Sequence, residues 1–290
     1  MFKGSIVALI TPFKGGKVDE EAYRQLINFQ IENGTAAIVP CGTTGESATL
    51  SVEEHNRVIS IAVEAVNKRV PVIAGTGGNS TNEAIELTRH AKDAGADATL
   101  QVTPYYNKPS QEGLFQHYRA IAQAVALPQV LYNVPGRTSI NMLPETVARL
   151  ADLPEIVAIK EASGNIGQMT EIVQLAGDKI TLLSGDDNLI LPVLSIGGAG
   201  VISVVANIVP KETAAIITSW EDGNTDQTRD LFIKLFPLCK AMFFETNPVP
   251  VKTSLALMGK IEEELRLPLV PMAESNLEKL KKVLTEYRLI

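Results

Sequence analysis

The chain has 290 residues, of which 45% are hydrophobic and 20% are charged. This is the composition of a globular protein with a full hydrophobic core, and the length suits one domain of barrel size or two smaller domains. The formal net charge of -7 at pH 7 and the scattered positions of Lys and Arg argue against a protein that binds nucleic acid.

Short apolar segments alternate with longer amphipathic segments along most of the chain, at a period of roughly 25 to 30 residues. The predicted strands are residues 5–10, 37–41, 71–76, 98–103, 129–134, 157–161, 180–184 and 201–205. The predicted helices begin near Asp19, Val52, Ser80, Gln111, Pro144, Ile166, Asn188 and Pro210. Eight strand–helix units predict a closed (β/α)8 TIM barrel, although a doubly wound open sheet produces the same local pattern. The chain length and the number of repeats favour the barrel.

Two of the predicted helices begin with capping residues. Ser51 is followed by Glu54, and Ser80 by Glu83, at the spacing of a capping box.

The strand–helix alternation stops after residue 223. Three helical patterns follow, at about 225–244, 248–258 and 274–287. In the last pattern Leu280 and Leu284 share one apolar face. We therefore predict a catalytic barrel domain at 1–223 and a C-terminal three-helix extension at 224–290.

Two cysteines occur, Cys41 and Cys239, far apart in sequence and each within an apolar stretch. This usage does not indicate a disulfide framework and leads us to expect a reducing compartment. The amino end shows no signal-peptide pattern, and no apolar run reaches the length of about 18 residues that a membrane helix needs. We therefore expect a cytoplasmic protein with no membrane partner, which binds small molecules or copies of itself.

The segment 156–159 is apolar at consecutive positions, as is typical of a strand buried on both faces, and Lys160 follows at its carboxyl end. Two interpretations of this lysine are open. Its ammonium group can reach water or an acidic partner at the edge of the sheet. Alternatively, burial among apolar neighbours favours the neutral amine, which can attack a carbonyl group and form a Schiff base.

In a barrel the active site lies at the carboxyl ends of the strands, and other polar residues occupy these positions. Thr43 and Thr44 lie between two glycines after the second strand, where amides and hydroxyls can bind an anion or relay a proton. An ordinary strand-to-helix turn uses the same residue types. Tyr105 and Tyr106 follow the fourth strand, and because adjacent tyrosines cannot both face one core, we expect at least one in a site or an interface.

Tyr132 lies within the fifth strand, and Arg137 follows it, within reach of a substrate carboxylate. A core tyrosine and a solvated loop arginine are the structural alternatives. Asp186 and Asp187 follow the seventh strand and could bind a metal ion, but they are also good N-terminal caps for the next helix. Because the histidines have no chelating spacing, we expect a mechanism without a metal ion.

Taken together, these residues indicate catalysis more strongly than each does alone. The fifth and sixth strands are expected to be neighbours, which places Tyr132 beside Lys160, with the Thr43–Thr44 turn and Arg137 nearby. Together they are the groups of a Schiff-base lyase or aldolase, with the phenol as proton shuttle and the arginine as carboxylate clamp. No cofactor is expected, because the covalent imine on the lysine is itself the electron sink.

Four motifs carry a resemblance to a known family. They are Gly42-Thr43-Thr44-Gly45-Glu46, Tyr132-Asn133-Val134-Pro135-Gly136-Arg137-Thr138, Ile159-Lys160-Glu161-Ala162-Ser163-Gly164 and Gly185-Asp186-Asp187. In this order they closely resemble the dihydrodipicolinate synthase family, within the superfamily of N-acetylneuraminate lyase and the class I pyruvate aldolases. The resemblance covers essentially the whole chain, including the segment 247–252.

The resemblance implies a lyase of lysine and diaminopimelate biosynthesis that condenses pyruvate with L-aspartate 4-semialdehyde to 4-hydroxy-tetrahydrodipicolinate. It assigns the Schiff base to Lys160 and the proton relay to Tyr132 and Thr43. The relay also includes Tyr106, which this family lends across a dimer interface. Substrate binding falls to Thr44 (pyruvate carboxylate), Arg137 (semialdehyde carboxylate) and two residues that line the pocket, Gly185 and Ile202.

The same resemblance implies a homotetramer, built as a dimer of dimers, and allosteric feedback inhibition by L-lysine. The residues that match the lysine site are Ser47, Ala48, His55, Asn79, Glu83 and Tyr105. Val52 departs from the pattern, because strongly sensitive members often carry a histidine there. We expect weak inhibition, through charge pairing between lysine and Glu83.

Two other functions remain open at this point. N-acetylneuraminate lyase and the 2-keto-3-deoxy sugar acid aldolases share the lysine, the tyrosine and the threonine turn, but a polyol substrate needs hydroxyl-binding side chains in place of a carboxylate clamp such as Arg137. A catalytically inactive homologue that senses a ligand is the alternative from a different class, although every position that the chemistry needs holds the right residue type.

Overall fold

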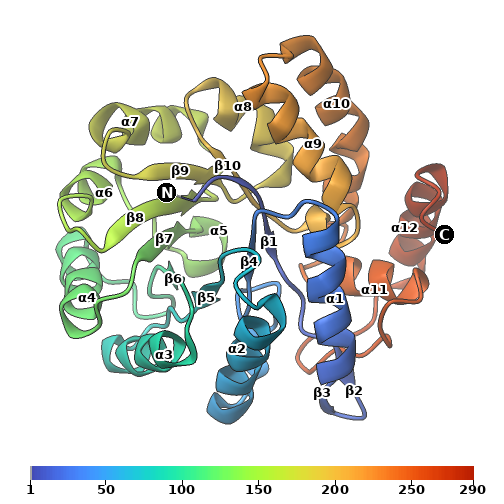
Figure 1. The fold of residues 1–290 in the computed structure, drawn as a ribbon, viewed down its shortest axis with the longest axis horizontal. Coiled ribbons are helices and arrows are strands. Elements are labelled where there is room, and N and C mark those ends of the chain that lie inside the picture. The colour runs from blue at the N-terminus through green and yellow to red at the C-terminus, as the bar shows by residue number, and fades with distance from the viewer. Residues whose placement is uncertain (1) are drawn as a thin grey trace.

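The computed structural model describes residues 2–290. Eight parallel strands form one sheet in the order β4-β1-β10-β9-β8-β7-β6-β5. Their bounds are β1 (Gly4–Ala8), β4 (Ala37–Val39), β5 (Ile73–Gly75), β6 (Ala98–Val102), β7 (Gln129–Asn133), β8 (Ile156–Glu161), β9 (Thr181–Ser184) and β10 (Gly200–Ser203). The two ends of this order meet through a bridge between Ile38 and Val72, so the sheet closes into a barrel (Figure 1).

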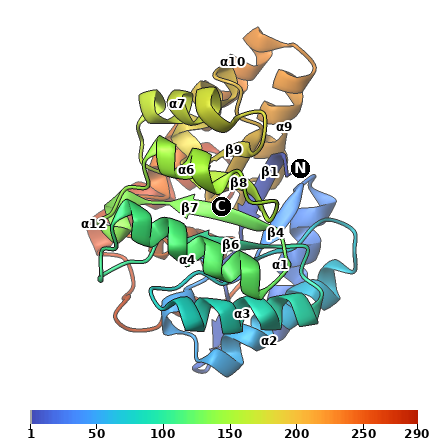
Figure 2. The ribbon, with the colours of Figure 1, turned by 90° about the vertical axis from the view of Figure 1, so that its left-hand side faces the viewer.

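Helices surround the barrel and cover its outer face (Figure 1). They are α1 (Glu20–Glu32), α2 (Val52–Val66), α3 (Thr81–Ala94), α4 (Gln111–Ala124), α6 (Pro144–Leu150), α7 (Ile166–Ala176), α8 (Ile190–Ser195) and α9 (Pro210–Glu221). Short 3-10 turns are η1 (Ser47–Thr49), η2 (Asp187–Leu189) and η3 (Val205–Asn207). Figure 2 shows α2, α3, α4, α6 and α7 stacked along one side of the molecule. The predicted TIM barrel is thereby confirmed.

Two short strands and one short helix were not among the predicted elements. β2 (Phe13–Lys14) and β3 (Lys17–Val18) form an antiparallel hairpin after β1. α5 (Pro135–Thr138) is a single helical turn after β7, and it carries Arg137.

The inner faces of the strands enclose an apolar core. A cluster of apolar side chains fills the inside of the barrel, and its members include Ile6, Val39, Ile73, Leu100, Val130, Tyr132, Ala158, Leu183 and Ile202. Lys160 of β8 pairs in register with Tyr132 of β7 on one side and with Leu183 of β9 on the other. Because directly paired residues of a sheet point to the same face, Lys160 belongs to this interior layer.

The C-terminal part consists of α10 (Thr225–Ala241), α11 (Val249–Leu257) and α12 (Glu274–Glu286), on the right-hand side of Figure 1. Leu238, Leu255 and Leu280 are fully buried and belong to the same apolar cluster as Val7 and Leu9 of the barrel. The extension therefore shares a core with the barrel, and the predicted division at 223/224 stays a prediction.

The two predicted capping boxes differ in the structure. At α2 both halves are made, because Ser51 accepts from the Glu54 amide and the Glu54 carboxylate accepts from the Ser51 amide. At α3 Ser80 accepts from the Glu83 amide, while the Glu83 carboxylate is not used in the box.

The predicted helix cap by the Asp186 and Asp187 side chains is wrong. Asp186 begins η2 without a side-chain bond to that turn. The Asp187 carboxylate instead accepts from the amides of Val204 and Val205, at 3.0 and 2.8 Å. Asp187 therefore joins the loop after β9 to the loop after β10.

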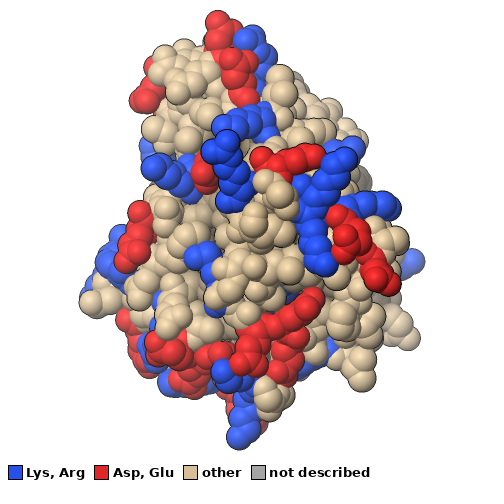
Figure 3. Space-filling view, turned by 90° about the vertical axis from the view of Figure 1, so that its right-hand side faces the viewer, with Lys and Arg blue, Asp and Glu red and all other residues tan. Residues whose placement is uncertain are grey.

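Positive and negative side chains lie interspersed over the face shown in Figure 3. Among residues 2–290, no helix combines the length and the apolar character that a membrane crossing requires. Both cysteines are free and buried.

Candidate functional site

Lys160 lies inside the barrel with 5% of its surface exposed. Its Nζ atom sits over the ring of Tyr132, 4.3 Å from the ring centroid. No ion pair in the described part of the chain involves Lys160. Neither structural interpretation of this lysine, exposure to water or pairing with an acid, fits this position. A buried amine beside a phenol is suited to nucleophilic catalysis.

Gly185 borders Lys160 at the end of β9. A Cβ atom added there would lie 2.6 Å from Cβ of Ala162 and 3.2 Å from Cε of Lys160. The lack of a side chain at this position therefore keeps space open around the lysine. Ile202, on β10, is fully buried in the same barrel interior.

Asp186 follows Gly185 at the same end of the barrel. Burial raises the pKa of its carboxyl group to about 6, the positive charge of Lys160 opposes this rise, and the negative charge of Asp187 adds to it. An acid with a pKa in this range exchanges protons near neutral pH.

The Thr43–Thr44 turn is held by its own backbone. The amides of Gly45 and Glu46 donate to the carbonyls of Gly42 and Thr43, at 3.0 and 3.1 Å. A Cβ atom on Gly45 would lie 3.1 Å from the Leu9 carbonyl, so the second glycine of the motif allows the turn to pack closely against the chain just after β1. The Thr43 and Thr44 hydroxyls thus belong to a tight turn whose backbone is held in place.

Asn247, in the loop between α10 and α11, connects two predicted substrate-binding residues. Its side-chain Nδ2 donates to Thr44 Oγ1 at 3.0 Å, and its carbonyl accepts from Arg137 Nη2 at 3.0 Å. No role for Asn247 was predicted, because it lies more than 100 residues from either partner.

A cavity of about 450 Å³ opens beside this turn. Its lining includes Thr43 and Arg137 together with five of the six residues predicted for lysine, namely Ser47, Ala48, His55, Glu83 and Tyr105. Asn79 is not part of the lining, but its carbonyl accepts from Asn107 beside Tyr106. The structure thus brings parts of both predicted sites to one cavity, while Lys160 and Tyr132 lie in the barrel interior.

His55 lines this cavity with a buried, neutral ring. Its Nε2 atom lies 2.8 Å from the Gly75 carbonyl, which can only accept, so this nitrogen carries the proton. Burial lowers the pKa of His55, which keeps the ring neutral. The other ring nitrogen, Nδ1, is buried and has no hydrogen-bond partner among residues 2–290.

Tyr106 stands apart from the other predicted catalytic residues. Its side chain is 91% exposed, and its backbone is in the left-handed region at φ 72°. Within one chain it therefore does not join Lys160 and Tyr132. A large aromatic side chain held out from the surface is typical of an interface.

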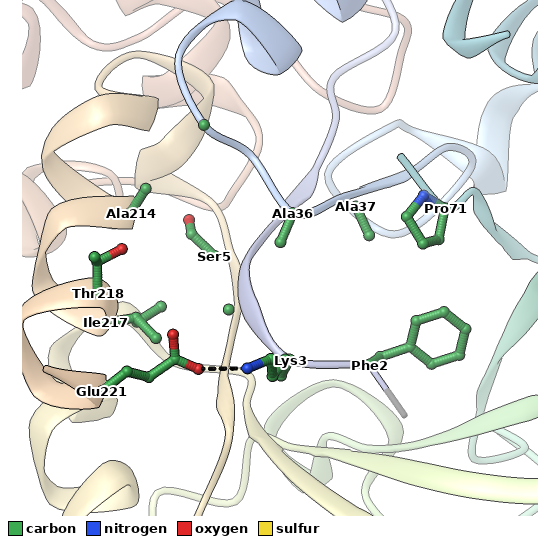
Figure 4. Close-up of a pocket in the computed structure, with 12 residues that line it drawn as sticks. Phe2, Lys3, Ser5, Ala36, Ala37, Pro71, Ala214, Ile217, Thr218 and Glu221 are labelled. Atoms are coloured by element: carbon green, nitrogen blue, oxygen red, sulfur yellow. Dashed lines mark hydrogen bonds and ion pairs between the residues drawn. The ribbon is translucent and has the colours of Figure 1, made fainter. Parts of the chain in front are cut away.

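A second cavity, of about 360 Å³, lies at the opposite end of the barrel, around the amino ends of β1 and β4. Figure 4 shows Ser5, Ala214 and Glu221 around it, with Lys3 Nζ 3.1 Å from Glu221 Oε1. None of the residues predicted for catalysis lines this cavity.

Comparisons with known proteins agree over the whole chain. The model of the dihydrodipicolinate synthetase family matches residues 1–287. The 4-hydroxy-tetrahydrodipicolinate synthase of Citrifermentans bemidjiense is 63% identical over 290 residues, all of both chains. These matches give no support to the sugar-acid lyase alternative.

Two solved structures are informative about ligands. The chloride-inhibited dihydrodipicolinate synthase of Acinetobacter baumannii, solved in complex with pyruvate, is 48% identical with a TM-score of 0.98 and covers all of both chains. The enzyme of Cyanidioschyzon merolae, solved with lysine bound, is 43% identical with a TM-score of 0.97, covering 100% of this chain and 99% of the other.

Proposed function

We propose that this chain, which belongs to the dihydrodipicolinate synthetase family, condenses pyruvate with L-aspartate 4-semialdehyde to 4-hydroxy-tetrahydrodipicolinate, the first committed step of diaminopimelate and lysine biosynthesis. The observation that carries the proposal is the buried amine of Lys160 beside the Tyr132 ring, at the carboxyl ends of the barrel strands. This is where barrel enzymes place their chemistry.

The reaction begins when the neutral amine of Lys160 attacks the keto carbon of pyruvate. Loss of water leaves an imine, which withdraws electrons and lets the methyl group lose a proton. The resulting enamine carbon attacks the aldehyde carbon of the semialdehyde, and the aldehyde oxygen takes up a proton. Tyr132 moves these protons, with Thr43 and Tyr106 of a second copy as the further members of the relay.

The substrate carboxylates need donors at fixed places. Thr44 binds the carboxylate of pyruvate, and Arg137 clamps that of the semialdehyde. Their shared contact with Asn247 supports this division, because it fixes the two donors relative to each other. Gly185 and Ile202 line the pocket around the imine.

The imine on Lys160 supplies the electron sink, so the proposal includes no cofactor. It also includes the cytoplasm as the place of action, which two free and buried cysteines support.

L-Lysine is proposed as a feedback inhibitor that binds in the 450 Å³ cavity. The Glu83 carboxylate offers an acceptor for an ammonium group of lysine. The relative solved with lysine bound supports this part of the proposal.

A homotetramer, built as a dimer of dimers, is the proposed assembly. The exposure of Tyr106 supports it, because a relay that includes this phenol needs a second copy to bring it to the site.

The proposal is tested by incubating the protein with pyruvate and sodium borohydride, which reduces an imine to a stable amine, followed by mass spectrometry of peptides. We expect a pyruvate-sized adduct on the peptide that holds Lys160 and none in Lys160→Met. In a separate incubation without borohydride, addition of the semialdehyde should lead to consumption of pyruvate. A folded protein without an adduct, or with the adduct on another lysine, would refute the proposal.

A further inference from the structure

A fully buried ion pair lies two residues beyond the Thr43–Thr44 turn. Lys252 Nζ, from α11 of the C-terminal extension, is 2.5 Å from Glu46 Oε1, and both side chains are 1% exposed. The Glu46 backbone is in the left-handed region at φ 53°. Glu46 thus combines an uncommon backbone conformation with a buried ion pair, and together they fix the path of the chain at this point.

The surroundings of the pair are built from three further parts of the chain. The Phe13 ring, from the β2–β3 hairpin, lies under both Lys252 and Arg266, each with its charged group 4.2 Å from the ring centroid. The Arg266 amide donates to the second oxygen of Glu46 at 3.3 Å. The Arg266 guanidinium makes two bonds of 2.6 Å to Glu54 at the start of α2. The Glu46 carboxylate is therefore held by both of its oxygens.

Stability alone does not account for such a pair. Burial lowers the pKa of Lys252, and the nearby charge of Glu46 opposes this effect. Removing two charges from water costs several kcal/mol for each ion, so a well-packed apolar pair of similar size is often as stable as a buried ion pair. Compared with an apolar pair, an ion pair restricts geometry, because its hydrogen bond is directional and an apolar contact is not.

We propose that Glu46 and Lys252 form a positioning pair, which holds the turn 42–46 so that the hydroxyls of Thr43 and Thr44 face the bound pyruvate. The pair links the catalytic turn of the barrel to the C-terminal extension across 206 positions of sequence. The expected effect of the pair on pyruvate binding rests on the proposed function, but its effect on the conformation of the turn 42–46 does not.

The test uses Glu46→Met, Lys252→Met and the double variant, compared with Leu280→Ala. Each single change leaves one charge or polar group buried without its partner, so both should unfold at a lower temperature than the double variant. Leu280 is fully buried in α12 and takes part in none of the hydrogen bonds or ring contacts of the pair, so its truncation weakens the extension while the contacts of the pair remain.

Two readouts separate positioning from stability. Hydrogen exchange should be faster at amides 42–50 in the double variant than in Leu280→Ala at equal loss of melting temperature. The KM for pyruvate should rise about ten- to a hundredfold in the double variant, because misplaced binding groups lose contacts that a stable fold does not restore. Leu280→Ala should keep the KM of the wild type.

The proposal is overturned if the double variant shows wild-type exchange at the turn and a wild-type KM, or if Leu280→Ala changes both to the same extent. Failure of the proposed function would look different. The wild type would then form no pyruvate adduct, while the exchange at amides 42–50 would still report whether the pair holds the turn.

Discussion

The contact between Lys160 and Tyr132 has two parts, the ring under the amine and the phenolic hydroxyl. Tyr132→Phe keeps the ring at 4.3 Å and removes the hydroxyl. If the hydroxyl moves protons, kcat should fall about 10²- to 10⁴-fold, the usual contribution of general acid–base catalysis, at an unchanged melting temperature. Steady-state kinetics and thermal unfolding measure both. Wild-type kcat in the folded variant would show that the relay runs without this phenol.

Gly185 allows a test of the space around the lysine. Gly185→Ala places a methyl group 2.6 Å from Ala162 and 3.2 Å from Lys160 Cε, so the amine should be displaced. We expect imine trapping with borohydride to slow about tenfold or more. Gly136→Ala is the matched control, because its added Cβ meets nothing within 4 Å. Equal trapping rates in the two variants would contradict the expected clash.

His117 of α4 provides a prediction on pH. Burial lowers its pKa from 6.5 to about 4, so between these values the unfolded chain binds the proton and the folded chain does not. Protonation therefore favours the unfolded chain, so the free energy of unfolding is highest above pH 6.5 and falls as the pH drops toward 4. This loss of unfolding free energy amounts to about 3 kcal/mol.

In His117→Gln the free energy of unfolding, measured in denaturant at several pH values, should depend less on pH over this range. The same slope as in the wild type would assign the acid sensitivity to other groups.

At the scale of elements, the start of α3 separates stability from ligand binding. The Glu83 carboxylate is not used in the capping box and lines the cavity. Glu83→Gln should therefore keep the melting temperature and lose inhibition by lysine, measured as activity against lysine concentration up to the millimolar range. If wild-type activity does not change with lysine concentration, the cavity does not bind lysine as an inhibitor. If Glu83→Gln is inhibited as strongly as the wild type, the Glu83 carboxylate does not bind lysine.

The elements also show what a sequence can predict. All eight barrel strands follow from their apolar runs, because each is buried on both faces. The strands β2 and β3 have two residues each, which is too short for any alternation to be visible. The single turn α5 begins with Pro135 and Gly136, which are typical of a loop.

The predicted site residues divide in the same way. Tyr132 and Lys160 could be placed side by side because consecutive strands of a parallel barrel are neighbours. Asn247 and Lys252 could not be assigned, since their partners Thr44 and Glu46 lie more than 200 positions away and no local pattern encodes such a contact. The one local feature that could have pointed to this contact is the position of Lys252, a charged residue within the apolar stretch of α11.

The whole molecule raises the question of which copy completes a site. If Tyr106 serves the neighbouring site, Lys160→Met and Tyr106→Phe are each inactive, but a mixed dimer contains one intact site. Random reassembly of the two variants should restore roughly a quarter of the wild-type sites, measured as activity after mixing. Mixing Lys160→Met with Tyr106→Phe should then exceed the sum of the separate activities.

The matched control is a mixture of Lys160→Met with Tyr132→Phe. In any pairing of these two variants the site with an intact lysine lacks its own phenol, so no activity should return. Recovery in both mixtures, or in neither, would contradict a crossed Tyr106.

In an assembly where Tyr106, which is exposed on its own chain, completes the site of a neighbouring copy, mutations of Tyr106 and of Lys160 inactivate different chains. A cell with two versions of the gene makes mixed assemblies, and an allele that loses Lys160 disables its own product alone. An allele that loses Tyr106 disables the product of the other allele and leaves its own site dependent on a healthy neighbour. Both losses leave about half of the sites active in such a cell, but a loss of Tyr106 inactivates sites on chains that are themselves intact, whereas a loss of Lys160 inactivates only the site of its own chain.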